Sequence, residues 1–223
     1  MGKDMNLDAT EIPRHVGIIP DGTRRWSRVH GVPLQDAYIE TMKKLAVLLG
    51  EVFRSGVPVA SVYLLSRKNC ERSSSDLDPV LRAEEQFVER LLPRVVNDLR
   101  VRVVHAGANS SRCESLIAAI RLLCGETADY SKRTLNLLVN YDPLVELASA
   151  VDPDGFDFTK LDVPDDVDLV IRTGGDARLS DFLPLQCGSA ELDFVSTLFN
   201  DTDCSEIIAS IRSFHQRSRR FGR

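Results

Sequence analysis

Cysteine and histidine are scarce in this chain of 223 residues, and neither occurs at the spacing of a metal site. No C-x-x-C pair is present, and an odd number of cysteines cannot pair completely. Such usage disfavours a disulfide framework or a zinc site and is typical of a reducing compartment, so we expect a cytoplasmic protein with buried thiols. The cysteines are Cys70, Cys113, Cys124, Cys187 and Cys204.

Long apolar runs are also missing. No segment approaches the roughly 20 apolar residues of a membrane-spanning helix, so we expect no membrane span. Residues 1–13 are polar and acidic, unlike a secretory signal, and we expect a flexible leader there, followed by a single domain over 14–223. The net charge of −5 disfavours a nucleic-acid partner, because only the last residues are strongly basic.

Six short apolar runs predict β-strands. Stretches with apolar residues at helical spacing separate most of them, at 35–54, 79–99 and 110–123, and another lies at 203–217. This alternation predicts an α/β fold: a single domain with a mainly parallel central sheet of about six strands flanked by helices on both faces. The expected strands are Val16–Ile19, Val59–Leu65, Val101–His105, Leu135–Asn140, Leu169–Ile171 and Ala190–Val195.

The stretch DLVIRTGGDARLS, over 168–180, carries the strongest chemical signal in the chain. An apolar run ends in Arg172, two glycines follow, and Arg178 and Ser180 come next. We interpret this as a buried strand that opens into a loop whose cations and backbone N–H groups converge. Guanidinium groups bind phosphate with paired hydrogen bonds, and glycines let the backbone approach an anion closely. The stretch therefore predicts a phosphate or diphosphate site.

A second stretch, HVGIIPDGTRRW over 15–26, has a similar design. A short apolar run is followed by Asp21 and Gly22, and then by Arg24 and Arg25. A carboxylate there can ligate Mg²⁺ while the arginines neutralise the remaining charge of a diphosphate. An Asp-Gly turn with exposed arginines would give the same letters. Two such loops after two strands favour function, because the carboxyl ends of parallel strands share one edge of the sheet.

Both stretches resemble the opening and closing motifs of the cis-prenyltransferases, the undecaprenyl diphosphate synthase family. The opening match is HVxIIxDGxxRW at 15–26, and the closing match is DLVIRTGGxxRLSxF at 168–182. AELxF at 190–194, LFxD at 198–201 and RRFG at 219–222 continue the resemblance in order. The match spans nearly the whole chain and implies the family's fold, with 14–223 as one prenyltransferase catalytic domain.

The resemblance also implies roles at the matching positions. Asp21 would hold Mg²⁺ on an allylic diphosphate and take part in catalysis, and Glu191 would complete the metal site, with a reach across a homodimer interface. Ser66 and Asn69 would act near both substrates, where either this pair or a diphosphate oxygen removes a proton. The implied diphosphate ligands are Gly22, Thr23, Arg24, Arg25, Trp26, Arg72, Arg172, Arg178, Ser180 and, closing over the partner subunit's site, Arg220 and Gly222.

Several positions depart from the family pattern. Thr23-Arg24 replaces an Asn-Gly pair, and Leu34 and Tyr38 replace an Arg and a His of the next helix. We expect Leu34 and Tyr38 to line the substrate cavity. Positive charge is rearranged rather than lost, because Arg24 and the basic pair at 67–68 are additions. The departures are similar to the lavandulyl-type branch, whose enzymes join two allylic diphosphates head-to-middle into short branched or cyclised products.

The leading hypothesis is therefore an irregular prenyl diphosphate synthase with Mg²⁺ as cofactor. Its substrates would be dimethylallyl diphosphate and a second dimethylallyl or geranyl diphosphate, and its product a short lavandulyl-type diphosphate. A conventional head-to-tail enzyme that uses isopentenyl diphosphate stays open. A non-catalytic subunit of a prenyltransferase complex also stays open, although such a subunit need not retain Asp21. A generic phosphate-binding domain would explain the arginines but not the order of all the motifs.

Overall fold

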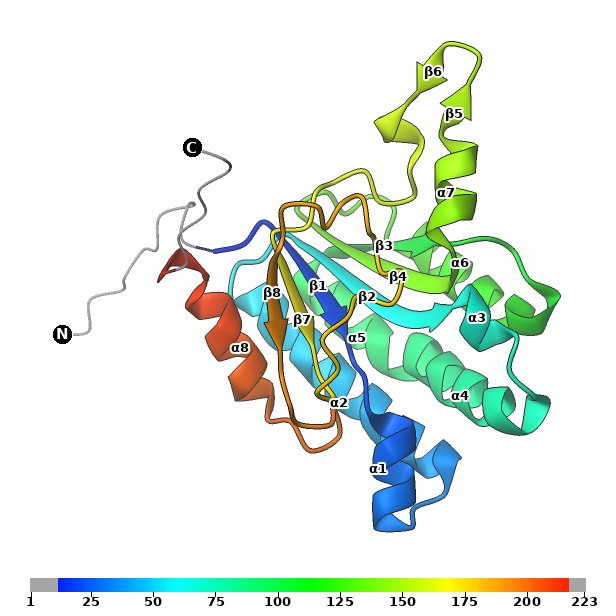
Figure 1. The fold of residues 1–223 in the computed structure, drawn as a ribbon, viewed down its shortest axis with the longest axis vertical. Helices are drawn as coiled ribbons and strands as arrows, with labels where there is room; N and C mark the ends of the chain where they lie inside the picture. Colours follow the sequence, from blue (N-terminus) through cyan, green and yellow to red (C-terminus); the bar gives the residue numbers. More distant parts are fainter. Residues whose placement is uncertain (1–11, 217–223) are drawn as a thin grey trace.

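The structure is a computed structural model that describes residues 12–216, and a six-stranded sheet runs through its centre (Figure 1). The strand order is β3-β4-β2-β1-β7-β8, and every neighbouring pair is parallel. All six expected strands are present, and the α/β prediction is confirmed. The strands are β1 (His15–Ile19), β2 (Val59–Ser66), β3 (Val101–Ala106), β4 (Arg133–Tyr141), β7 (Leu169–Arg172) and β8 (Glu191–Phe194).

The larger core lies between the sheet and a layer of helices. This layer forms because apolar side chains recur at helical spacing: Leu45, Leu49 and Val52 of one helix are fully buried. Each such side chain contributes about 1.5–3 kcal/mol when it leaves water. The helices are α2 (Leu34–Arg54), α4 (Ser74–Gln86), α5 (Leu92–Leu99) and α6 (Glu114–Glu126), with α8 (Cys204–Arg212) beside them (Figure 1).

The expected helix over 79–99 differs from the observed one. It begins earlier, at Ser74, and a π-helical turn, η1 (Phe87–Leu91), separates α4 from α5. Pro93 near the start of α5 explains the break, because proline has no N–H to donate to the preceding turn. The extra residue in that turn changes which side chains α4 and α5 direct at the sheet.

The second face of the sheet is covered differently from the expectation of helices on both sides. Val163, Val167, Phe182 and Leu183 form the smaller core there with side chains of the strands, and they belong to segments without α-helix. Gly17 of β1 permits this close cover, since a Cβ at that position would lie 2.5 Å from the Phe182 ring. Irregular chain can lie over this face because its backbone groups pair with neighbouring segments.

The remaining elements are short. Three short helices were not expected: α1 (Thr23–His30), α3 (Arg67–Cys70) and α7 (Pro143–Ser149). Polar residues dominate α1 and α3, and α7 is only seven residues long. No helix within 12–216 has both the length and the apolar character to cross a membrane. Nearly all of the expected leader, and the positions of Arg220 and Gly222, lie outside the described residues. The smallest elements are β5 (Val151–Asp152), β6 (Gly155–Phe156), η2 (Ser111–Cys113), η3 (Phe158–Lys160) and η4 (Phe214–Gln216).

Candidate active site

A cavity of about 300 Å³ lies at the carboxyl edge of β1, β2 and β7, bordered by α1, α2 and α4. In a parallel sheet this edge is where ligands bind. Five arginines and two carboxyl groups line the cavity, so its lining is strongly cationic. Twelve of the predicted site residues line it: Asp21, Gly22, Thr23, Arg24, Arg25, Tyr38, Ser66, Asn69, Arg72, Arg172, Arg178 and Ser180.

The turn from β1 into α1 presents backbone N–H groups to the cavity. Gly22 has φ 116°, and a Cβ there would lie 2.9–3.0 Å from Leu198, so only glycine fits this turn. The helix starts at the next residue, Thr23. The first N–H groups of a helix have no intrahelical acceptor, and the helix dipole adds positive potential. The turn is therefore suited to an anion such as diphosphate.

Arg172, at the end of β7, is the central cation of the site. Its side chain is only 4% exposed, and its Nη2 donates to Oδ2 of Asp21 at 2.7 Å. Its Nη1 donates to Oγ of Ser180 at 2.8 Å and to the backbone carbonyl of Arg178. These contacts hold the guanidinium plane at a fixed angle in the cavity wall, and they tie the loop after β7 to the turn after β1.

A second carboxylate, Asp176, pairs with the cations that surround Asp21. Its Oδ2 lies 2.8 Å from Nη2 of Arg178, 3.4 Å from Nη2 of Arg25 and 4.0 Å from Nη2 of Arg172. Arg25 also lies 3.4 Å from Asp21. In this state the two aspartates neutralise guanidiniums that a diphosphate could bind instead.

Two further arginines approach from the side of α4. Arg24 pairs with Asp76 at 2.9 Å, and Arg72 lines the cavity beyond the end of α3. Tyr38 of α2 lies near both, and burial together with the neighbouring Glu84 raises the pKa of its phenol to about 12, although the two arginines act in the opposite direction. Tyr38 is therefore a neutral hydroxyl at neutral pH, where the family pattern has a histidine.

Ser66 and Asn69 lie at the junction of β2 and α3. The Ser66 Oγ accepts a hydrogen bond from the Asn69 N–H at 3.1 Å, so this serine caps α3 while it lines the cavity. Tyr63, three residues before the end of β2, donates a hydrogen bond from its hydroxyl to the carbonyl of Ser180 at 3.1 Å. Burial raises the pKa of Tyr63. The hydrogen bond from Tyr63 therefore links β2 to the loop after β7.

Comparison with known proteins agrees with this geometry. The profile of a family described as putative undecaprenyl diphosphate synthase matches residues 19–222. The chain belongs to the cis-prenyltransferase family. An isoprenyl transferase of Fusobacterium nucleatum is 33% identical over 95% of this chain and 96% of its own length. A tritrans,polycis-undecaprenyl-diphosphate synthase (geranylgeranyl-diphosphate specific) of Pyrococcus horikoshii is 32% identical over 95% of this chain and 88% of its own.

A solved structure is similar over the whole fold. Lavandulyl diphosphate synthase from Lavandula x intermedia, crystallised in complex with dimethylallyl diphosphate, superposes with a TM-score of 0.87 at 25% identity. The match covers 97% of this chain and 100% of that one. The chain is thus a prenyltransferase, and the family makes prenyl diphosphates.

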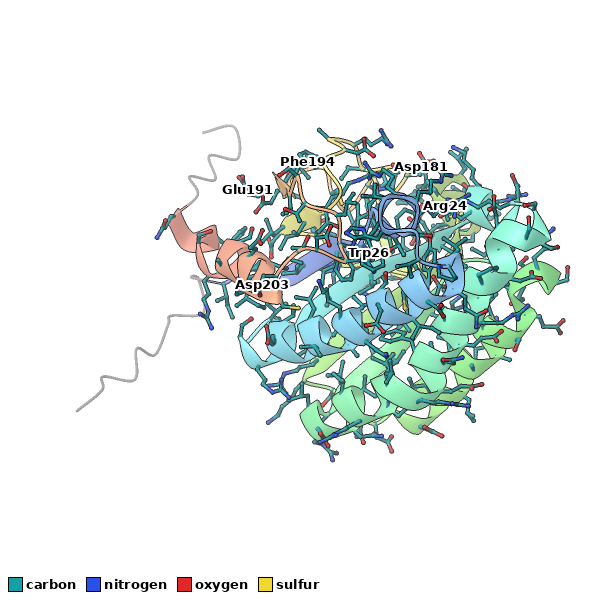
Figure 2. The ribbon with its side chains drawn as sticks, turned by 90° about the horizontal axis from the view of Figure 1, so that it is seen from below. Arg24, Trp26, Asp181, Glu191, Phe194 and Asp203 are labelled. Carbon is teal, nitrogen blue, oxygen red and sulfur yellow. The ribbon has the colours of Figure 1, made fainter. Side chains whose placement is uncertain are left out.

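Three predicted residues of this cis-prenyltransferase do not line the cavity. The Trp26 Nε1–H donates to Asp201 at 2.7 Å and its ring stacks on His30, so Trp26 braces α1 against the loop after β8. Leu34 is the first residue of α2 and lies outside the lining. Glu191 begins β8 opposite Leu169, and is thus at the far end of the sheet from Asp21, apart from Arg24 and Trp26 in Figure 2.

The structure also adds lining or pairing residues that the sequence interpretation missed. Asp176 stands between the two glycines and Arg178, and its ion pairs with Arg25 and Arg178 were not predicted from the sequence. Thr41 and Met42 lie one turn beyond Tyr38 on the buried face of α2, so helical spacing could have found them. Glu84 has a comparable signal, because its position follows Leu77 and Val80 on the apolar face of α4.

The carboxylates of the cavity fit the requirements of Mg²⁺ only together with a substrate. Magnesium usually takes one or two carboxylates together with substrate phosphates and water. Asp21 supplies one carboxylate, and its ion pairs with Arg172 and Arg25 both use Oδ2. No group of three metal-binding side chains occurs within residues 12–216. The site therefore fits a magnesium ion that arrives with a diphosphate, and it does not resemble a cage built from protein ligands alone.

Proposed function

We propose that this cis-prenyltransferase joins two allylic diphosphates head-to-middle and releases inorganic diphosphate. The substrates are dimethylallyl diphosphate and a second dimethylallyl or geranyl diphosphate, and the product is a short branched lavandulyl-type diphosphate. The observation that carries the proposal is the placement of two sets of cations in one cavity. Arg25, Arg172 and Arg178 pair with Asp21 or Asp176, and Arg24 and Arg72 line the cavity from the side of α4. Two diphosphates can dock there side by side.

The residues divide the chemistry between two positions. The turn at Gly22 and the arginines of α1 hold the diphosphate that leaves, and positive charge there stabilises the departing group as the allylic C–O bond breaks. Arg172, Arg178 and Ser180 anchor the second diphosphate, so that its alkene lies against the allylic carbon. Asp21 would hold Mg²⁺, which neutralises charge that develops on the leaving diphosphate.

A proton must also leave the new carbon skeleton. We propose that a diphosphate oxygen or the Ser66–Asn69 pair accepts it. The Ser66 Oγ accepts the Asn69 N–H at 3.1 Å and also contacts the Tyr63 phenol, so its hydroxyl is held in place at the cavity wall. The apolar side chains between α2 and α4, including Met42 and Leu65, provide the surface for the hydrocarbon.

The relation to the lavender enzyme supports the irregular reaction. That structure, bound to dimethylallyl diphosphate, is similar over the full length of both chains. The replacement of the family's Arg and His by Leu34 and Tyr38 supports it as well. Incubation with dimethylallyl diphosphate and Mg²⁺, with and without geranyl diphosphate, tests the proposal by identification of the dephosphorylated products. Long linear polyprenyl products alone would overturn it.

A second candidate is conventional head-to-tail elongation. The Pyrococcus horikoshii relative, named for a tritrans,polycis-undecaprenyl product, favours it. This reaction requires isopentenyl diphosphate, so strict dependence of turnover on that substrate would decide for elongation. Asp21→Ala serves as the control in both assays: lost turnover with an unchanged circular dichroism spectrum separates chemistry from misfolding.

We further propose a cytoplasmic homodimer. Glu191 cannot complete the Asp21 site within one chain, because β8 carries it to the opposite end of the sheet. β8 is an edge strand, and Leu192 on it is 42% exposed. A second copy packed on this edge could bring its own Glu191 to a neighbouring site. Light scattering of the purified full chain tests the dimer, and a monomeric mass at working enzyme concentration would contradict it.

A further inference from the structure

A carboxyl group that the reaction does not use lies inside the cavity. Glu84 of α4 is 1% exposed and lines the cavity, and its Oε2 has no hydrogen-bond partner. A buried polar atom without a partner destabilises a fold, so an unpaired carboxyl in a cavity wall indicates a requirement set by the ligand. Its neighbours Leu77, Val80 and Ala83 on the same helix face are all apolar and buried.

Glu84 lies on the α4 side of the cavity. The turn after β1 and the loop after β7 hold Asp21, Arg172 and Arg178, whereas Glu84 faces the cavity from α4, near Tyr38 of α2 and Arg72. The hydrocarbon of a diphosphate held by those two segments would extend between α2 and α4, toward Glu84. Burial raises the pKa of Glu84 well above its usual range, and the nearby Cys113 and Glu85 act in the same direction while Arg72 opposes them. Burial therefore favours the neutral form of this carboxyl group.

We propose that Glu84 is a specificity-determining residue whose polarity, rather than its volume, selects the tail of the allylic substrate. The inference rests on the proposed use of allylic diphosphates. A five-carbon tail leaves space in which the Glu84 side chain can turn and bring its carboxyl oxygen to water. A longer apolar tail displaces that water and covers an oxygen that no protein group satisfies. A tail that bears a hydroxyl at its far end supplies the missing hydrogen bond.

Two variants separate polarity from volume. Glu84→Gln keeps the size and the hydrogen-bonding capacity, whereas Glu84→Met keeps a similar size and removes the polarity. Glu89→Gln, at an exposed position in the following turn, is the matched control. The substrates are dimethylallyl, geranyl and farnesyl diphosphate together with ω-hydroxygeranyl diphosphate, and the measurement is the ratio of kcat/KM values within each variant.

We expect Glu84→Met to raise the preference for geranyl over dimethylallyl diphosphate by at least about tenfold, and to abolish the advantage of ω-hydroxygeranyl over geranyl diphosphate. Glu84→Gln and Glu89→Gln should keep both wild-type ratios. Glu84→Met should also unfold at a higher temperature in the absence of ligand, because an unpaired buried carboxyl has been removed. Equal ratios in wild type and Glu84→Met, or an equal shift in Glu84→Gln, would overturn the proposal.

A binding measurement tests tail selection by Glu84 separately from the question of head-to-middle or head-to-tail reaction. The S-thiolodiphosphate analogues of the same four substrates, whose allylic bond resists ionisation, are titrated in the presence of Mg²⁺, and their dissociation constants are compared by calorimetry. If the enzyme elongates with isopentenyl diphosphate instead, the proposed head-to-middle function fails while the Glu84-dependent ratios of affinity stand. If the dissociation constants show no dependence on Glu84, the tail-selection inference fails whatever the products are.

Discussion

The Asp21→Asn variant tests how the charge of Asp21 affects the affinity of the cavity for diphosphate, with and without Mg²⁺. In the structure Asp21 neutralises Arg172 at 2.7 Å and Arg25 at 3.4 Å. Without metal, the same carboxylate repels a diphosphate that approaches these arginines. The substitution removes the charge and keeps the size, so metal-free binding and magnesium-dependent binding should change in opposite directions.

The magnitude follows from the distances. Two unit charges about 5 Å apart interact with about 3 kcal/mol at an effective dielectric constant of 20, and with about 1 kcal/mol in water. The Asp21 side chain is 31% exposed, so screening places the repulsion at about 1–2 kcal/mol. Metal-free inorganic diphosphate should therefore bind Asp21→Asn about 5- to 30-fold more tightly than wild type.

The assay is titration calorimetry with inorganic diphosphate, first in EDTA and then in Mg²⁺. Wild type should bind more tightly when magnesium is added, and Asp21→Asn should lose most of that gain. Its turnover should fall at least about a hundredfold, since charge stabilisation at the leaving group is lost. Asp154→Asn, at an exposed position outside the cavity, is the control. Weaker metal-free binding by Asp21→Asn, or a full magnesium effect in it, would refute the reasoning.

Three further predictions concern the frame of the site. Trp26→Phe removes the hydrogen bond to Asp201 and should lower the melting temperature by about 2–4 °C while kcat/KM changes less than about threefold; a large loss of activity would show that the indole contacts substrate. Gly174→Ala should destabilise the protein by about 2–3 kcal/mol in urea unfolding and reduce activity, because φ is 91° and the new Cβ would lie 2.6 Å from Arg25; an unchanged stability would contradict the geometry. Burial lowers the pKa of His15 below 6.5 in the folded protein. Near and below pH 6.5, His15 therefore binds a proton in the unfolded chain more readily than in the folded protein. Stability should thus fall as pH drops from about 7 to 5, and His15→Gln should flatten that dependence; an equal slope in the variant would assign the effect elsewhere.

Much of the fold could be predicted from the sequence, because its strands are short apolar runs bounded by polar loops. The run before Arg172 and the run before Asp21 both predicted buried strands, and both are neighbours in the sheet. The segments that pack on the second face of the sheet could not be predicted. Phe182 and Leu183 belong to no periodic segment, and only the backbone of Gly17 opposite them makes that packing possible.

The candidate site was predicted unevenly for a similar reason. Residues close to a strand end, such as Asp21 and Arg172, could be assigned to the cavity because chain position fixes their place at the sheet edge. Trp26 follows in the same motif, yet the turn of α1 directs its indole to Asp201 and away from the cavity. Glu84 was overlooked because a glutamate in a largely polar helix is ordinarily solvated, although its spacing after Leu77 and Val80 places it on the face of α4 that the fold buries.

The sequence by itself determined the strand pattern, the two cationic loops and the family, since these depend on local residue order and spacing. The tertiary structure alone decided which of those residues share the cavity, because the distance from Asp21 to Arg172 or from Tyr38 to Glu84 depends on how strands pair and helices pack. It also decided that two aspartates neutralise the arginines before any ligand binds. Charge and burial at that site are properties of the assembled sheet edge, and no segment of the chain carries them alone.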